Sequence, residues 1–219
     1  GLVNFDDVMD VAEEEVTEDM HKMAAMAAMD EAYLSASIFS MVRKRVGWLA
    51  ILFGGQLLTA LAMIQYKGAL EKFQYLVFFL PLIISSGGNC ASQAATLIIR
   101  SMAIQDLDLS DWWRVVRREM ASGLALGLAM AALALVMTAV AQESLFGPNY
   151  WKLGITIALS LVGVVIFGCL FGALLPFVLR ALKFDPAVCS TPLVMTLVDV
   201  SGLIIYMLIA GAILGFTLG

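Results

Sequence analysis

Charged side chains are scarce in this sequence: 14% of its 219 residues are Asp, Glu, Lys or Arg, against about 25% in a typical soluble domain. Apolar residues make up 61%. They gather in five runs of about 20 residues or more, each long enough to cross a hydrocarbon layer of about 30 Å. This composition excludes a soluble enzyme, a nucleic-acid-binding protein and a disordered chain. The sequence therefore predicts an all-α integral membrane protein that lies in a lipid bilayer.

Side chains that bind soft or borderline metals are also nearly absent. His21 is the only histidine, and Cys90, Cys169 and Cys189 have no spacing typical of a metal site or a disulfide framework. We interpret His21 as a surface residue and the three cysteines as packing residues. Oxygen atoms are the remaining candidate ligands, and they favour hard cations.

The apolar runs define five predicted membrane spans, at residues 46–66, 70–103, 120–142, 152–181 and 190–217. The second and fourth spans are too long for a straight crossing, so they must tilt, break or protrude. The second contains Pro81 and then Ser-Ser-Gly-Gly-Asn at residues 85–89. We expect a break in the helix there, which a membrane protein tolerates only beside protein or a water-filled cavity.

The segment before the first span is acidic and then amphipathic. Ten of the 18 acidic residues lie within the first 31 positions, and Asp6 to Met29 has a helix-forming composition. Residues 30–45 place apolar side chains at helical spacing and end in the basic cluster at 43–45. We therefore divide the chain into an acidic helix at 1–29, an amphipathic cytoplasmic helix at 30–45 and a five-helix membrane domain at 46–219.

Basic residues predict the orientation of the spans. Nine Lys and Arg residues lie on one side of the predicted membrane: Arg43, Lys44, Arg45, Arg100, Arg114, Arg117, Arg118, Arg180 and Lys183. Only Lys67, Lys72 and Lys152 lie on the other. The positive-inside rule puts the N-terminus in the cytoplasm and the C-terminus outside the cell membrane. The connection before the third span reads as an interfacial helix, capped by Ser110 or Asp111, with Trp112 and Trp113 at headgroup level.

Asp199 is the one ionisable residue inside the five spans, away from their ends. A carboxylate near mid-membrane costs about 2.5–3.5 kcal/mol even on the lenient insertion scale, so it needs a compensating partner. One reading is a protonated Asp that is hydrogen-bonded to a neighbouring helix. The other is a carboxylate that binds a mobile cation, since every Lys and Arg lies at a span end or outside.

Polar residues in the second and fifth spans favour the cation reading. Six lie within twelve residues of the second span: Ser85, Ser86, Asn89, Ser92, Gln93 and Thr96. Thr191 and Thr196 precede Asp199 in the fifth span. Helix–helix hydrogen bonding explains a single Ser or Thr, but this density beside Gly87 and Gly88 indicates a pore lining. Mg²⁺ retains several waters and suits such a site, and a two-fold dimer would bring two Asp199 carboxylates to one axis.

At these residues the sequence resembles the MgtE family of magnesium channels. The resemblance runs from Pro81 to Arg100, through Asp106-Leu107-Asp108-Leu109 and Trp112, to Asp185-Pro186-Ala187 and the block from Pro192 to Tyr206. It covers all five predicted spans in order, and Gly-Gly-Asn together with Thr-Leu-x-Asp-x-x-Gly is specific.

The resemblance implies a homodimeric Mg²⁺ channel with its pore between the subunits, lined by the second and fifth spans. It implies that Asp199 binds a largely hydrated Mg²⁺, assisted by the backbone carbonyl of Met195. The implied pore-lining residues are Gly87, Gly88, Asn89, Ser92, Thr96, Thr191 and Thr196. Ser92 and Thr191 stand where many family members have Asn, which exchanges an amide for a hydroxyl.

The resemblance also extends to the N-terminal segment. Residues 1–11 are similar to the last strand and helix of a CBS domain, and residues 30–45 to the plug helix that joins that domain to the membrane. The chain would then be a fragment that lacks most of its cytoplasmic domains, and Mg²⁺-dependent closure would be weakened.

Other functions fit less well. A proton-coupled divalent-cation transporter would need flux that depends on a pH gradient. A non-conducting membrane sensor leaves Asp199 unexplained. An intramembrane aspartyl protease needs two carboxylates that share a proton, and one chain offers one, so we expect no enzyme.

Overall fold

Five long helices form the bundle seen in the computed structural model, which describes residues 4–25, 36–146, 150–186 and 190–216. All five are long and apolar enough to cross a membrane, which confirms the predicted number of spans. The helices are α1 Phe5–Met23, α2 Ile38–Gln65, α3 Lys67–Lys72, α4 Tyr75–Ala103, α5 Trp112–Phe146, α6 Tyr150–Ala181 and α7 Thr191–Leu214. A short 3₁₀ helix, η1 Leu109–Asp111, precedes α5.

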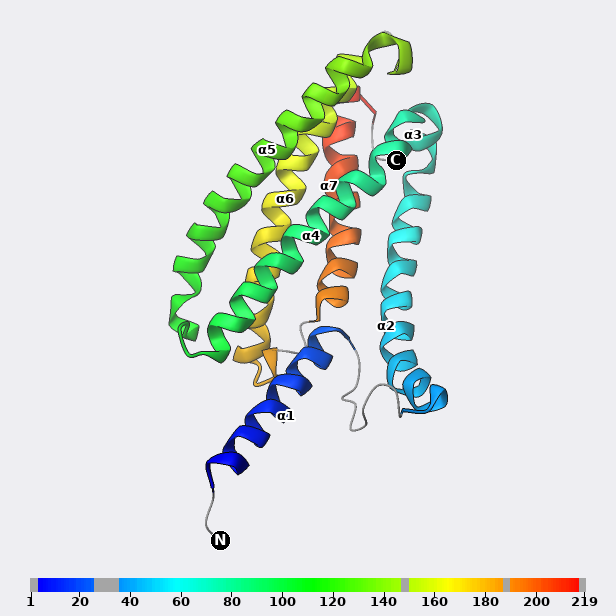
Figure 1. The fold of residues 1–219 in the computed structure, drawn as a ribbon. Helices are drawn as coiled ribbons and strands as arrows, with labels where there is room; N and C mark the ends of the chain where they lie inside the picture. Colours follow the sequence, from blue (N-terminus) through cyan, green and yellow to red (C-terminus); the bar gives the residue numbers. More distant parts are fainter. Residues whose placement is uncertain (1–3, 26–35, 147–149, 187–189, 217–219) are drawn as a thin grey trace.

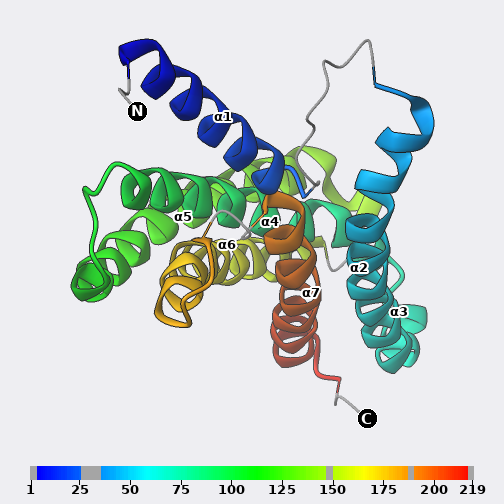
Figure 2. The ribbon, with the colours of Figure 1, turned by 90° about the horizontal axis from the view of Figure 1, so that it is seen from below.

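The helix α6 lies at the centre of the bundle and packs against α4, α5 and α7 (Figure 1). By contrast α2 stands apart, because among the long helices in the described part of the chain it packs mainly against α7 (Figure 2). Most of the apolar side chains on α2 are consequently exposed, with Phe53 at 62% and Leu57 at 49%. Such a surface is stable only in contact with lipid or with another protein.

The first span starts earlier than the sequence predicted. The helix α2 begins at Ile38, where the Ser37 hydroxyl caps it by accepting a hydrogen bond from the Ser40 amide at 3.1 Å. It then continues to Gln65 without a break at residue 46, and the segment contains no proline. Residues 38–45 of the predicted plug helix thus belong to the same helix as the span, and residues 30–35 lie outside the described ranges.

The acidic N-terminal segment is helical from Phe5 to Met23, so residues 5–11 extend a helix and form no strand. The predicted helix to Met29 ends earlier in the described residues, where Ala25 has a φ of 55°. This left-handed conformation stops α-helical hydrogen bonding.

The second span is interrupted at a different place from the one predicted. The break separates α3 from α4 at Phe73 and Gln74, whereas α4 runs unbroken through Pro81, Gly87 and Gly88. The predicted break at residues 85–89 was therefore wrong. One of its glycines, Gly87, serves helix packing instead.

A close crossing of α4 and α6 is built on small residues spaced four apart. A Cβ added at Gly168 would overlap the carbonyl oxygen of Gly87, and one added at Gly172 would overlap the carbonyl oxygen of Ala91. Small residues at this spacing allow two membrane helices to approach until their backbones touch. The crossing fixes which side of α4 faces α6.

Aliphatic and aromatic side chains of α4, α6 and α7 form the core beside this crossing. Leu76, Ile83, Ile157, Leu203 and Tyr206 are all fully buried. The Tyr206 hydroxyl donates a hydrogen bond to the Leu76 carbonyl oxygen at 3.1 Å. This bond satisfies the one polar atom of a large buried side chain and ties α7 to α4.

The interfacial helix predicted before the third span is the first part of α5, which runs unbroken from Trp112 to Phe146. Its start is organised by Asp108 and Asp111, which form a reciprocal capping box around η1. The N-cap is therefore Asp108, and the predicted cap residue Asp111 is its partner in the capping box. Trp112 and Trp113 are about half exposed, at 50% and 49%.

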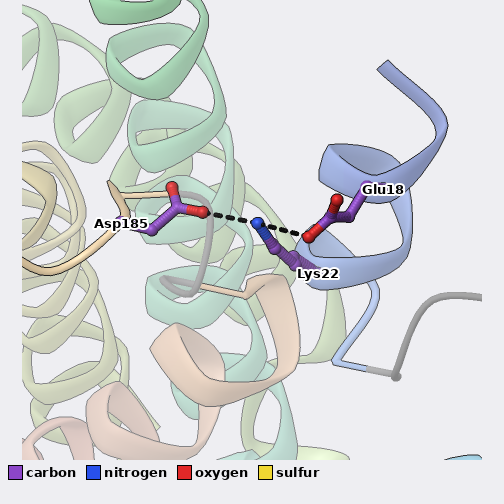
Figure 3. Close-up of polar contacts among 3 residues, drawn as sticks. All are labelled: Glu18, Lys22 and Asp185. Atoms are coloured by element: carbon purple, nitrogen blue, oxygen red, sulfur yellow. Dashed lines mark hydrogen bonds and ion pairs between the residues drawn. The ribbon is translucent and has the colours of Figure 1, made fainter. Parts of the chain in front are cut away.

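The end of α1 docks on the bundle through one lysine. The Lys22 ammonium donates a hydrogen bond to Asp185, in the segment between α6 and α7, at 2.7 Å and also pairs with Glu18 at 2.9 Å (Figure 3). The hydrogen bond to Asp185, and then the one to Glu18, raises the pKa of Lys22 above its ordinary value. Next to Lys22, Met23 packs against the cluster that contains Val194 and Val198. The contact therefore combines charge with apolar packing at one end of the bundle.

The crossing of α4 and α6 predicts an unusual sensitivity to a single methyl group. We expect Gly172→Ala to lower the free energy of unfolding by about 1–3 kcal/mol, the usual cost of overpacking. Gly54→Ala is the matched control, because nothing lies within 4 Å of the added Cβ. Unfolding in detergent, followed by circular dichroism, measures both. Equal stability of Gly172→Ala and the native protein would contradict the close crossing.

The docking of α1 predicts a local change when its ion pair is removed. An exposed ion pair contributes up to about 1 kcal/mol, so Asp185→Asn should speed amide hydrogen exchange in α1 by up to about fivefold at low salt. Exchange in α4 should not change. Glu71→Gln removes the exposed pair with Lys67 on α3 and should leave α1 unaffected. Unchanged exchange in the Asp185→Asn variant would mean that Met23 alone holds α1.

Candidate ion site

Asp199 lies on α7 at the ninth of 24 residues, close to the middle of the helix. The neighbouring Val198 is fully buried against the bundle and Gly202 is buried one turn later, whereas Asp199 is half-buried. The carboxylate therefore sits at the edge of the packed face of α7. The described residues offer it neither a hydrogen-bond donor nor a cation within contact distance.

A groove of about 660 Å³ runs between α2 and α7 and reaches Asp199. We call it the α2–α7 groove. It is lined by Val46, Leu49, Ala50, Leu52, Phe53 and Gln56 from α2, and by Pro192, Met195, Thr196 and Asp199 from α7. Asp199 is the one charged residue among them, so any cation that enters the groove meets a single carboxylate.

Gly88 of α4 forms the opposite side of the site. A Cβ at Gly88 would lie 3.6 Å from the Asp199 Oδ1 atom and 3.5 Å from Met195 Cγ. The absence of a side chain thus leaves one carboxylate oxygen uncovered. Gly87 faces α6 instead of Asp199, because a Cβ there would collide with Val164 of α6. Of the two predicted pore-lining glycines, the structure brings Gly88 to Asp199 and puts Gly87 in the α4–α6 interface.

Polar residues of α4 share one side of the helix next to Gly88. We call Ser85, Asn89, Ser92 and Thr96 the polar stripe, since their spacing of three and four residues puts them on one helix face. Ser85, Asn89 and Thr96 are exposed and Ser92 is half-buried. The Asn89 side-chain amide donates to the Ser85 hydroxyl at 3.4 Å. The polar stripe and Asp199 therefore lie on adjoining surfaces of the bundle.

The remaining predicted site residues belong to the first two turns of α7. Thr196 is buried in the α2–α7 groove, and its hydroxyl donates to the Pro192 carbonyl oxygen at 2.8 Å. Thr191 is the first residue of α7, after the Ser190 cap. The Met195 carbonyl accepts the hydrogen bond of the Asp199 amide, as four-residue spacing in an α-helix requires. One lone pair of that oxygen is left for another donor or a cation.

Chemically, the arrangement suits a hydrated hard cation. In the part of the chain that the structure describes, no three His, Cys, Asp or Glu side chains gather as a metal-ligand cluster. The oxygen ligands that share the groove with Asp199 are the Thr196 hydroxyl, the Met195 backbone carbonyl and the Gln56 side-chain amide. An ion that keeps most of its water can use such sparse oxygen donors through hydrogen bonds from its water shell.

Sequence reasoning missed the α2 wall of the groove. A polar residue in mid-span, Gln56 after Gly54-Gly55, was a signal that could have found it. Cys169 is buried on α6 and Cys90 is half-buried on α4, and both are free thiols. Cys189 lies outside the described residues.

Comparison with known proteins identifies the family. The family model for MgtE, described as a divalent cation transporter, matches residues 80–209. The chain is 43% identical to the magnesium transporter MgtE of Thermus thermophilus over 218 residues, which cover 98% of this chain and 46% of that protein.

Two further relatives bear the same name. The magnesium transporters MgtE of Bacillus subtilis and Enterococcus faecalis are each 29% identical, over 97% and 96% of this chain and 45% and 44% of their own lengths. The chain thus spans somewhat less than half the length of these relatives. The match of the family model, together with the identity to the Thermus protein, shows that the chain belongs to the MgtE family.

Proposed function

We propose that this chain forms a homodimeric Mg²⁺ channel, through which magnesium enters the cytoplasm with most of its water shell, held at Asp199. The observation that carries the proposal is an uncompensated carboxylate. Asp199 lies half-buried at mid-helix in the α2–α7 groove, and no described residue offers it a hydrogen bond or a positive charge. An intramembrane acid without a protein partner points to a mobile cation as its countercharge.

The polar stripe supports a pore between two copies of the chain. Its amide and hydroxyl groups lie on an exposed surface of α4, at a depth where lipid offers no hydrogen bonds. A second copy that faces this surface would enclose the groups in a water-filled path. Two Asp199 carboxylates beside one path would then match the double charge of Mg²⁺.

Magnesium is supported as the cargo by ligand chemistry and by the relatives. Mg²⁺ gives up its waters reluctantly and is commonly held by one or two carboxylates, which fits a site with one Asp per chain. The similar proteins of Thermus thermophilus, Bacillus subtilis and Enterococcus faecalis are named magnesium transporters.

The distribution of charge supports the direction of insertion. The starts of α2, α5 and α7 and the ends of α4 and α6 lie at one end of the bundle, beside α1 (Figure 1). The nine basic residues identified in the sequence flank these helix ends. The positive-inside rule then puts this end, with α1, in the cytoplasm and the C-terminus outside the cell membrane.

Loss of the carboxylate is the first test of the proposal. We expect Asp199→Asn to reduce Mg²⁺ entry into proteoliposomes at least tenfold, since a loss of about 1.4 kcal/mol in ion binding already gives this factor. Asp106→Asn is the control, because Asp106 is exposed in the α4–α5 connection. Native-like flux through a folded Asp199→Asn protein would contradict the proposal. Flux that requires a pH gradient would instead identify a proton-coupled transporter.

The contact with Gly88 gives a second test. In Gly88→Ala the new methyl lies at ordinary contact distance from Asp199 Oδ1, so the fold should persist while one face of the carboxylate loses access to water. We expect Mg²⁺ flux to fall several-fold with no change in thermal stability. Gly47→Ala, on the open surface of α2, should leave both unchanged. Full flux in Gly88→Ala would show that hydration of Oδ1 is not needed.

A further inference from the structure

We propose that Gln56 of α2 is a specificity-determining residue of the Asp199 site, where its side-chain amide accepts hydrogen bonds from the water shell of the cation. The inference rests on the proposed function and adds a third helix, α2, to the walls of the ion path. It starts from the α2–α7 groove, which Gln56 and Asp199 both line.

Packing between α2 and α7 fixes the depth of Gln56. A Cβ at Gly55 would collide with the Thr196 methyl, so the two backbones approach closely at this point. Gln56 directly follows Gly55, and Asp199 lies about one turn after Thr196. Val46 and Pro192 line the groove nearer the start of each helix. Gln56 and Asp199 therefore belong to opposite walls of the groove, each farther along its helix than Val46 and Pro192.

The side chain of Gln56 is otherwise unexplained. Its neighbours on the α2 wall, Leu52 and Phe53, are apolar, and no described residue forms a hydrogen bond with Gln56. Gln56 is exposed on the single chain, and a primary amide that faces hydrocarbon without partners is costly. Water in the groove, or water carried by an ion, would satisfy both the carbonyl and the amino group.

The chemistry of the amide favours a hydrated ion over a dehydrated one. The Gln carbonyl oxygen is a neutral acceptor, well suited to the polarised O–H groups of metal-bound water. Mg²⁺ keeps several waters, whereas Ca²⁺ accepts six to eight protein oxygens directly in flexible geometry. A site with one amide opposite one carboxylate should therefore bind an ion that retains its waters more tightly than an ion that sheds them. Removal of the amide should weaken the preference for Mg²⁺ over Ca²⁺.

The test compares Mg²⁺ and Ca²⁺ entry into proteoliposomes for the native protein and for Gln56→Met, which keeps length and volume but removes both polar atoms. We expect the half-saturating Mg²⁺ concentration to rise about two- to tenfold, the range of one neutral hydrogen bond, and the Mg²⁺/Ca²⁺ selectivity ratio to fall. The maximal flux should change less. Gln56→Asn, which retains an amide, should restore part of the preference.

Gln65→Met is the matched control, because Gln65 is the last residue of α2, exposed and outside the groove. An unchanged half-saturating concentration and selectivity in folded Gln56→Met would overturn the inference, even if Asp199→Asn abolished flux. A lower maximal flux with unchanged half-saturation would make Gln56 merely structural and would also overturn it. If Gln56→Met does not fold, Gln56→Glu decides: an added charge in the groove must lower half-saturation for Mg²⁺, and no change would refute the role.

Absence of ion entry in the native protein would refute the proposed function itself. That outcome differs from a result that contradicts only the role of Gln56, because neither the native protein nor any variant would then show ion entry.

Discussion

Backbone contact between α4 and α6 determines how the rest of the bundle is arranged. The carbonyl oxygens of Gly87 and Ala91 lie where any side chain on Gly168 or Gly172 would have to stand. This contact turns Gly87 toward α6, and the 100° step of a helix then directs Gly88 toward α7 and Asp199. The polar stripe follows on the next part of the same helix surface. A packing constraint thereby orients the polar groups around the acid.

The second constraint is electrostatic. A carboxylate at mid-membrane must be neutralised, protonated or hydrated, and the described residues supply Asp199 with neither a cation nor a hydrogen-bond donor. The groove beside it offers space for water and for an ion. In the proposed function, a mobile cation with its water is what compensates the energetic cost of the Asp199 carboxylate.

Much of this organisation was predictable from sequence, for identifiable physical reasons. Hydropathy gives the number of spans because a span must be long and apolar. Asp199 stands out because it is the one Asp, Glu, Lys or Arg inside the predicted spans, away from their ends. The roles of Gly87 and Gly88 were not predictable, since neighbouring glycines look alike until their partner helices are known. The same holds for Lys22 and Asp185, which are 163 positions apart, and for Gln56, whose depth depends on how α2 packs against α7.

Direct localisation of the ion would show whether Asp199 holds a hydrated divalent cation. Anomalous scattering from Mn²⁺ in crystals of the protein would give its position independently of any flux assay. We expect a peak beside the Asp199 carboxylate, beyond the roughly 2.1 Å of direct coordination, in the space shared by α2, α4 and α7. A peak confined to the acidic residues of α1, with none near Asp199, would contradict it.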